Sequence, residues 1–265
     1  WQISFLILSG IITLCSIGLL FIPEKNSTEK INSQNIADQK ILNKIGISNQ
    51  FTKGFAWLYG AIVGPLLSFF KKNTINVAFS ILAFVFLFKI GEAFLGRMSL
   101  VFYKEIGFSK TDIALYSKGI GWLTTVTFTL LGGLFAVRMG LVKAMFLSGI
   151  FMALTNVLFS VLAWVGNSEI LFAFTVLIDD LAAAFATVAF VGFISALVDR
   201  NYTATQYALL ASIGTLGRTL FASSSGMMVD WLNGNWIIFF IITALMVIPS
   251  LVCLFLIRKK INLNE

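Results

Sequence analysis

The sequence contains no histidine, only two cysteines, and few charged residues of either sign. Without histidine, a histidine metal site, a Ser-His-Asp triad and a histidine proton shuttle are all excluded, so any proton transfer falls to carboxylates. Cys15 and Cys253 both lie in apolar segments, which argues against a disulfide framework and a thiolate metal site. We therefore expect no metal and no other cofactor.

The scarcity of charge also excludes a soluble domain with a charged surface. Charged residues make up 12% of the chain and hydrophobic residues 58%, with a mean hydropathy of +0.92. The net charge of +7 does not predict nucleic-acid binding, because the lysines and arginines are scattered among apolar segments and form no basic face. The composition predicts a membrane protein.

Seven apolar stretches are long enough to cross a bilayer, which takes roughly 20 helical residues. Short turns separate most of them, so neighbouring helices should run antiparallel. The sequence thus predicts an all-α, polytopic bundle of transmembrane helices. The expected spans are Ile3 to Phe21, Ile75 to Leu100, Thr111 to Val137, Leu141 to Val165, Ile170 to Val198, Thr205 to Val229 and Trp236 to Ile257.

The distribution of basic residues predicts the orientation of the spans. Most of the 19 Lys and Arg residues fall on the side of the polar stretch that begins at Glu24, whereas Lys104 and Lys110 fall on the opposite side. Because cytoplasmic loops carry the excess of Lys and Arg, we place the polar stretch and the C-terminus in the cytoplasm.

Residues 51–70 are apolar enough to span the membrane, but a span here would divide the basic residues between the two sides. We therefore expect an amphipathic helix on the inner membrane surface. The predicted organisation is a first span (1–22), a cytoplasmic linker containing the interfacial helix (23–74), a six-helix bundle (75–257) and a cytoplasmic tail (258–265).

Several ionisable side chains fall inside predicted spans, where lipid exposure costs about 2.5 to 3.5 kcal/mol on insertion scales. Lys89 and Glu92 are three residues apart, so they can form a structural ion pair or line a polar cavity. Arg97 lies nearer the outer end of its helix, where it can reach lipid headgroups or a ligand.

Asp179 and Asp180 occur side by side near the middle of a predicted span. Adjacent helical positions point about 100° apart, so one carboxylate can face a cavity while the other meets a neighbouring helix. An Asp-Asp pair also begins the metal-diphosphate motifs of membrane prenyltransferases. No third acidic residue follows three or four positions later, so we do not expect an enzyme.

Arg218 lies on a polar helix face with hydroxyl residues spaced three and four apart: Ser212, Thr215, Thr219 and Ser223. One interpretation is close helix packing, helped by Gly214 and Gly217. The other is an anion site, because a guanidinium in the membrane needs an anionic partner. Lys118 is a similar cation nearer the outer end of its span.

In five blocks the chain resembles the AmpG muropeptide permease family of the major facilitator superfamily, from about Phe51 to Arg258. A loop with Gly132, Gly133, Arg138, Gly140 and Lys143 is similar to the facilitator signature. The other blocks are Phe88-Lys89-Ile90-Gly91-Glu92-Ala93-Phe94, Ile106-Gly107-Phe108-Ser109, Ser117-Lys118-Gly119-Ile120-Gly121, and Tyr202-Thr203-Ala204-Thr205-Gln206-Tyr207-Ala208-Leu209-Leu210 followed by Arg218. The chain departs from the family at Asp179-Asp180, where a Glu-Asn pair is usual.

The resemblance implies proton-coupled import of anhydromuropeptides, which are peptidoglycan fragments, across the bacterial inner membrane. It implies that the chain holds the C-terminal half of a transporter and the last span of the first half, as a fragment that lacks the N-terminal half. The alternatives are a transport-inactive remnant and a transporter of another anionic solute such as acetyl-coenzyme A. The implied proton-coupling residues are Glu92, Asp179 and Asp180, and the implied substrate-binding residues are Lys89, Arg97, Lys118, Arg218, Thr215 and Gln206.

Overall fold

The computed structural model describes residues 2–21, 65–199 and 202–261, which fall into two compact units, 1–60 and 61–265. In the first unit, α1 (Gln2–Leu20) is a single helix whose apolar side chains, such as Phe5 and Leu14, are exposed. The predicted interfacial helix lies outside the described residues, except that residues 65–72 are helical.

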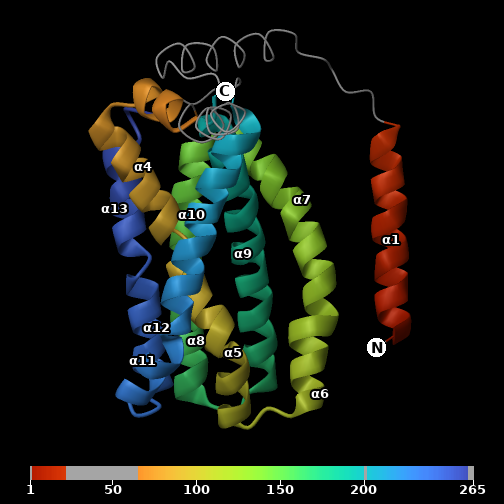
Figure 1. Cartoon of the computed structure of the whole chain (residues 1–265). Helices are drawn as coiled ribbons and strands as arrows, with labels where there is room; N and C mark the ends of the chain where they lie inside the picture. The colour runs from red at the N-terminus through yellow and green to blue at the C-terminus, as the bar shows by residue number, and fades with distance from the viewer. Residues whose placement is uncertain (1, 22–64, 200–201, 262–265) are drawn as a thin grey trace, which may run out of the picture. The chain divides into compact units, whose positions relative to one another are not determined.

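The second unit is a bundle of helices, with no strand among the described residues (Figure 1). The predicted all-α membrane fold is therefore confirmed. The helices are α4 (Ile75–Leu87), α5 (Ile90–Ile106), α6 (Lys110–Asp112), the π-helical segment η1 (Ile113–Ile120), α7 (Gly121–Met139), α8 (Leu141–Val165), α9 (Glu169–Leu197), α10 (Thr203–Ser223), α11 (Ser225–Trp231), α12 (Trp236–Leu245) and α13 (Ile248–Ile257).

Within the described residues, four helical segments are long and apolar enough to cross a membrane: Ile75–Ile106, Leu141–Val165, Glu169–Leu197 and Trp236–Ile257. The other predicted spans are interrupted or shorter. The π-helical turn η1 precedes α7, and a bend at Ser224 separates α10 from α11. Periodicity in the sequence found the apolar stretches, but it did not predict these interruptions.

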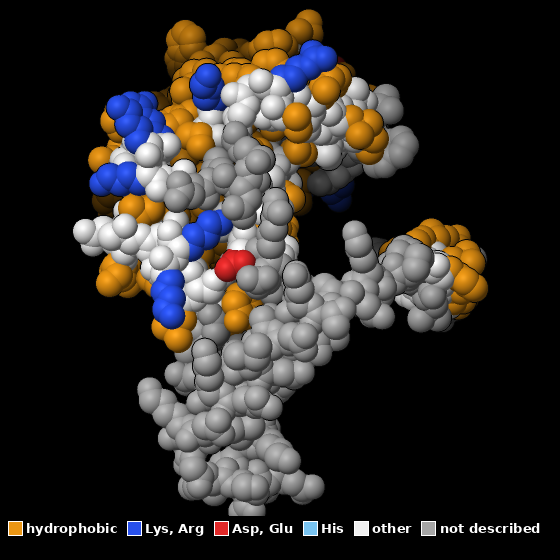
Figure 2. All heavy atoms as spheres, turned by 90° about the horizontal axis from the view of Figure 1, so that it is seen from above, with side chains coloured by type: hydrophobic (Ala, Val, Ile, Leu, Met, Phe, Trp, Pro, Cys, Tyr) orange, Lys and Arg blue, Asp and Glu red, His pale blue; other side chains and the backbone are white. Residues whose placement is uncertain are grey.

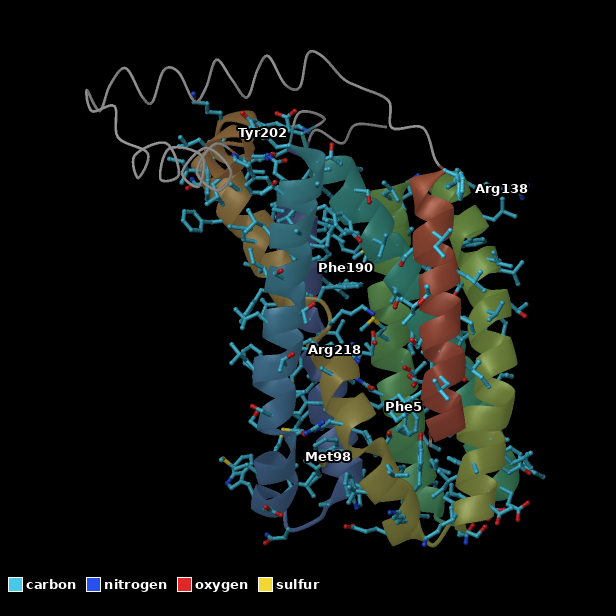
Figure 3. The ribbon with its side chains drawn as sticks, turned by 45° about the vertical axis from the view of Figure 1, so that its right-hand side comes forward. Phe5, Met98, Arg138, Phe190, Tyr202 and Arg218 are labelled. Carbon is cyan, nitrogen blue, oxygen red and sulfur yellow. The ribbon has the colours of Figure 1, made fainter. Side chains whose placement is uncertain are left out.

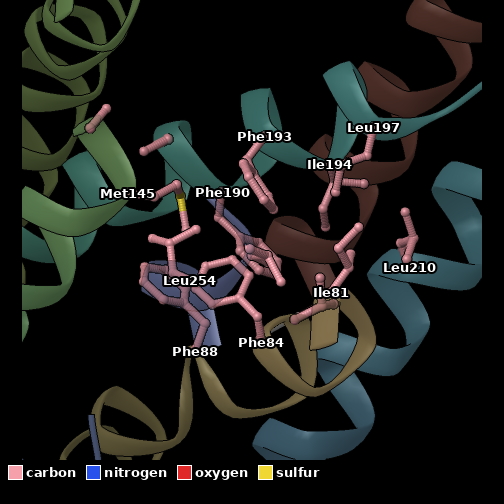
Figure 4. Packing of buried hydrophobic residues seen from close by; sticks show 14 of the residues in the cluster. Ile81, Phe84, Phe88, Met145, Phe190, Phe193, Ile194, Leu197, Leu210 and Leu254 are labelled. Atoms are coloured by element: carbon pink, nitrogen blue, oxygen red, sulfur yellow. The ribbon is translucent and has the colours of Figure 1, made fainter. Parts of the chain in front are cut away.

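Phenylalanine side chains fill the interior of the bundle. One cluster joins α4, α8, α9, α10 and α13, and in it the rings of Phe88 and Phe190 stack with centroids 5.5 Å apart (Figure 4). A second cluster lies toward the opposite end and joins α5, α8, α9 and α12 through Phe102, Phe159, Phe172 and Phe240. The aromatic packing fixes the helices around the charged residues between the two clusters.

Two helices are broken where they cross each other. The first break is at Phe88–Lys89, between α4 and α5, and the second is at Met246–Val247, between α12 and α13. Pro249 follows the second break and has no N–H to continue the helix. A Cβ atom on Gly91 would lie 2.9 Å from the Thr243 carbonyl oxygen and 2.8 Å from Val247 Cγ2. Only glycine permits this close crossing.

Two glycines of α10 hold that helix against the end of α4. A Cβ on Gly217 would collide with the backbone carbonyl oxygen of Phe86, and one on Gly214 would lie 3.0 Å from the Phe190 ring. Gly214 and Gly217 therefore pack closely against α4 and α9. These contacts fix the position of α10 beside the α4–α5 break.

We expect Gly217→Ala to destabilise the protein by about 1 to 3 kcal/mol, because the added methyl group meets backbone that cannot move without shifting a helix. Gly226→Ala on α11 is the control, since its Cβ would lie 3.9 Å from the nearest atom, Met98 Cε. The midpoint of thermal unfolding in detergent measures both. Equal midpoints for the two variants would contradict this account of the crossing.

Candidate functional site

An ion pair lies at the break between α4 and α5. Lys89 has a non-helical backbone (φ −95°, ψ 11°), and its Nζ donates to Glu92 Oε2 at 2.9 Å and to Thr187 Oγ1 on α9 at 2.8 Å. The Lys89 and Glu92 side chains are 13% and 19% exposed. The predicted pairing of Lys89 with Glu92 is thus present, and it joins the start of α5 to α9.

The two adjacent aspartates of α9 face different helices. Asp180 Oδ2 accepts a hydrogen bond from Thr124 Oγ1 on α7 at 3.1 Å, and a Cβ on Gly121 would lie 3.0 Å from the same oxygen. Asp179 instead lies near Thr155 of α8, whose hydroxyl donates to the Met152 carbonyl oxygen at 3.0 Å. This arrangement agrees with the expected divergence of neighbouring helical positions.

The π-helical segment and a missing side chain together place α7 against Asp180. η1 ends at Ile120, and Gly121, the first residue of α7, leaves the space that the carboxylate occupies. π-helical turns are frequent at functional sites because they shift the register of a helix. Within the described residues, no three acidic or cysteine side chains gather as a metal site.

A pocket of about 370 Å³ lies between α5 and α10. Arg97 of α5 and Arg218 of α10 both line it, together with Thr215. Both arginine side chains are exposed, and neither forms an ion pair within the described part of the chain. Arg218 lies in the last two turns of α10 (Figure 3). Three predicted substrate-binding residues therefore meet in one pocket.

Small residues make the space between these arginines. Ala93 and Gly96 line the α5 wall, and Ala222 lies on the α10 wall. A Cβ on Gly96 would meet nothing within 4 Å, so the pocket is open at that point. Arg97 follows Ala93 by four residues, which places both on the same face of α5.

Gln206 lies elsewhere, and the structure gives it a different environment from the predicted one. It is 3% exposed, its Nε2 donates to the Pro65 carbonyl at 2.8 Å, and its Oε1 accepts from the Asp199 N–H at 2.6 Å. Both ends of the amide are therefore used within the protein, where they join α10 to residues 65–72 and to the end of α9. The side chain of Lys118 lies outside the described residues.

The hydroxyl partners of the charged residues were not predicted from the sequence. Thr187 accepts a hydrogen bond from Lys89, Thr124 donates one to Asp180, and Thr155 lies near Asp179. One sequence signal could have pointed to Thr187. It follows Asp180 by seven residues, which is two helical turns, so the two side chains lie on the same face of the helix. The other two lie on different helices, and only the folded arrangement brings them to α9.

The known proteins that are similar to this chain in sequence carry related names. No family model matches the chain. A Rickettsia felis protein named as a transporter, AmpG 4, is 31% identical over 99% of the chain, and a Rickettsia prowazekii protein named as a transporter, AmpG 1, is 31% identical over 86%. The chain is a homologue of the AmpG permeases. The predicted resemblance is confirmed.

A third relative has a more specific name. The anhydromuropeptide permease of Escherichia coli is 25% identical to this AmpG homologue over 99% of the chain. The chain covers 58%, 52% and 48% of the three relatives, respectively, so it spans about half the length of the curated relatives it matches. Together with the apolar helices, these matches make the chain a multi-pass membrane protein.

The ion pair gives a prediction of stability. Glu92→Gln removes the carboxylate and leaves the partly buried Lys89 ammonium without its anion, so we expect a loss of about 1 to 3 kcal/mol. The double variant Lys89→Met, Glu92→Met should recover most of this loss, because no uncompensated charge remains. Glu169→Gln, at an exposed position at the start of α9, is the control. A double variant as unstable as Glu92→Gln alone, by thermal unfolding, would contradict the pairing.

Proposed function

We propose that this AmpG homologue acts in proton-coupled import of anhydromuropeptides across the bacterial inner membrane. The observation that carries the proposal is the pocket that Arg97 and Arg218 line from two different helices. A guanidinium inside a membrane needs an anion, and a ligand carboxylate supplies one. The name of the Escherichia coli relative supports a ligand of this class.

The pocket receives one part of such a ligand. Its volume of about 370 Å³ lies at the lower end of the range for small-molecule sites, roughly 300 to 1,000 Å³. In transporters built from two repeats, the substrate is held between the halves near the middle of the membrane. We therefore propose that α5 and α10 form one wall of the transport cavity, within a C-terminal six-span half formed by residues 75–257, and that an N-terminal half forms the facing wall.

Glu92 is suited to link proton binding to helix movement. Its carboxylate holds Lys89, and Lys89 also binds Thr187 on α9. Protonation of Glu92 would remove the ionic part of this contact, so that α5 and α9 could separate more easily. Asp180 makes the comparable contact with α7 through Thr124, and Asp179 is next to α8. These carboxylates are therefore our candidates for proton coupling.

The charge at the two ends of the bundle supports a cytoplasmic C-terminus. Basic residues gather at the end where α7 and α13 finish, and Figure 2 shows Lys and Arg side chains across that end. They include Lys71, Lys72, Arg138, Lys143, Arg258, Lys259 and Lys260. At the other end, Lys104 and Lys110 are balanced by Glu105, Asp112, Glu169 and Asp230. By the excess of basic residues in cytoplasmic loops, the first end faces the cytoplasm.

Removal of one arginine tests the pocket. Arg218→Ala should weaken anhydromuropeptide binding by roughly 2 to 5 kcal/mol, and Arg218→Lys should weaken it less because a cation remains. Uptake of labelled anhydromuropeptide into proteoliposomes containing the protein measures the change, with Arg258→Ala, at an exposed position directly after α13, as the control. Unaltered affinity in Arg218→Ala would show that this residue is structural.

Removal of the carboxylates tests the coupling. Glu92→Gln and Asp180→Asn should each abolish accumulation driven by a pH gradient while exchange of internal for external substrate partly persists, because the neutral side chain cannot take up or release a proton. Paired assays of uphill accumulation and exchange separate the two effects. Full uphill accumulation in both variants would refute this assignment.

A further inference from the structure

Three hydroxyl side chains of α10 line the pocket one helical turn apart: Thr215, Thr219 and Ser223. Each donates its hydrogen to a carbonyl oxygen of its own helix, at 2.9 Å to Ala211, 2.9 Å to Thr215 and 2.6 Å to Leu220. A hydroxyl group has one hydrogen and two lone pairs. The three oxygens therefore remain available to the pocket as hydrogen-bond acceptors, spaced about 6 Å apart along the helix.

The arginines of the pocket have the opposite chemistry. Guanidinium groups donate hydrogen bonds and accept none, and they are permanently positive. The pocket thus combines two cationic donors, Arg97 and Arg218, with a row of neutral acceptors. A ligand that fits both must place an anion close to N–H or O–H donors.

We propose that the pocket binds a carboxylate on Arg97 and Arg218 and a secondary amide N–H on the hydroxyl oxygens of α10. The α10 hydroxyls then determine specificity, because they select ligands in which an amide lies near the carboxylate. This inference rests on the proposed function and deepens it. The amide belongs either to an N-acetyl group on a sugar acid or to a peptide bond near a free carboxyl end.

A phosphate ester fits the pocket less well than this pairing does. A fully ionised phosphate offers only acceptors. To bind it, the threonine hydroxyls would have to withdraw their hydrogens from the helix carbonyls at Ala211 and Thr215. A carboxylate with an adjacent amide uses the donors and acceptors as they already stand, so no internal hydrogen bond is lost.

The test uses ligands that differ only in an N–H group. One pair is N-acetylmuramic acid and its O-acetyl analogue, and the other is N-acetyl-alanyl-alanine and the depsipeptide with an ester in place of its central amide. Equilibrium binding is measured on the full chain in lipid nanodiscs. We expect the amide member of at least one pair to bind roughly three to ten times more tightly than its ester, as one hydrogen bond allows. The pair that shows the preference identifies the source of the amide.

Paired threonine variants show whether α10 is responsible. Thr215→Val, Thr219→Val should abolish the preference for the amide while binding of the esters changes less than twofold, and Thr215→Ser, Thr219→Ser should retain it. Thr125 and Thr129 of α7 give a matched control, since they are also four residues apart and each donates to a carbonyl of its own helix. Valine at both of these positions should leave the preference unchanged.

Two results would overturn the inference: equal binding of amide and ester in both pairs, or a preference that survives the valine substitutions on α10. The variant Arg218→Gln shows whether only the role of the α10 hydroxyls is wrong or the proposed function as well. If Arg218→Gln weakens every ligand while the α10 valines do nothing, the anion pocket stands and the role of the hydroxyls is wrong. If Arg218→Gln changes the binding of no ligand, or if none of the four binds, both proposals fail.

Discussion

A charge in the middle of a lipid bilayer is expensive, at about 2.5 to 3.5 kcal/mol on insertion scales, and the arrangement of this bundle follows from that cost. Lys89 satisfies its charge with Glu92 and Thr187, so one ion pair also joins α5 to α9. Asp180 is held by Thr124 of α7. Hydroxyl groups thus act as the polar partners that water would provide elsewhere, and each of them fixes a neighbouring helix.

Backbone N–H and C=O groups that are left without helical hydrogen bonds at a break are also costly to expose to lipid. At the α4–α5 break, the carbonyls of Val85 and Phe86 are approached closely by Gly214 and Gly217 of α10. Irregular backbone at membrane depth is tolerated where protein covers it. The glycines therefore serve two purposes: they cover the broken end of α4, and they bring the face of α10 that carries Arg218 to the α5 wall of the pocket.

The sequence predicted the apolar helices and the intramembrane charges because both depend on composition and periodicity within one segment. It also offered two interpretations of α10, close packing through glycine and an anion site at Arg218. The structure shows that adjacent faces of one helix carry them, with Gly214 and Gly217 against α4 and Thr215 and Arg218 in the pocket.

The break between α4 and α5 could not be predicted in this way. The residues at this break are Phe88 and Lys89, and neither is a proline or a glycine. Local helix propensity alone therefore favours a continuous helix there. The environment of Gln206 was missed for the same reason, because its partners Pro65 and Asp199 depend on how α9, α10 and residues 65–72 meet. Contacts between distant segments decide these features.

The break at Lys89 gives the proton coupling that we propose for Glu92 a structural basis. In an unbroken helix, residues three apart hold a fixed position relative to each other, and a change in charge alters little else. Here Lys89 lies outside regular helix, between two segments that separate aromatic clusters hold in place. A proton on Glu92 would therefore change the Lys89–Glu92 contact at the joint between α4 and α5, while the aromatic packing on each side keeps its geometry. The same joint carries the close contacts of α10, so a movement there would reach the pocket directly.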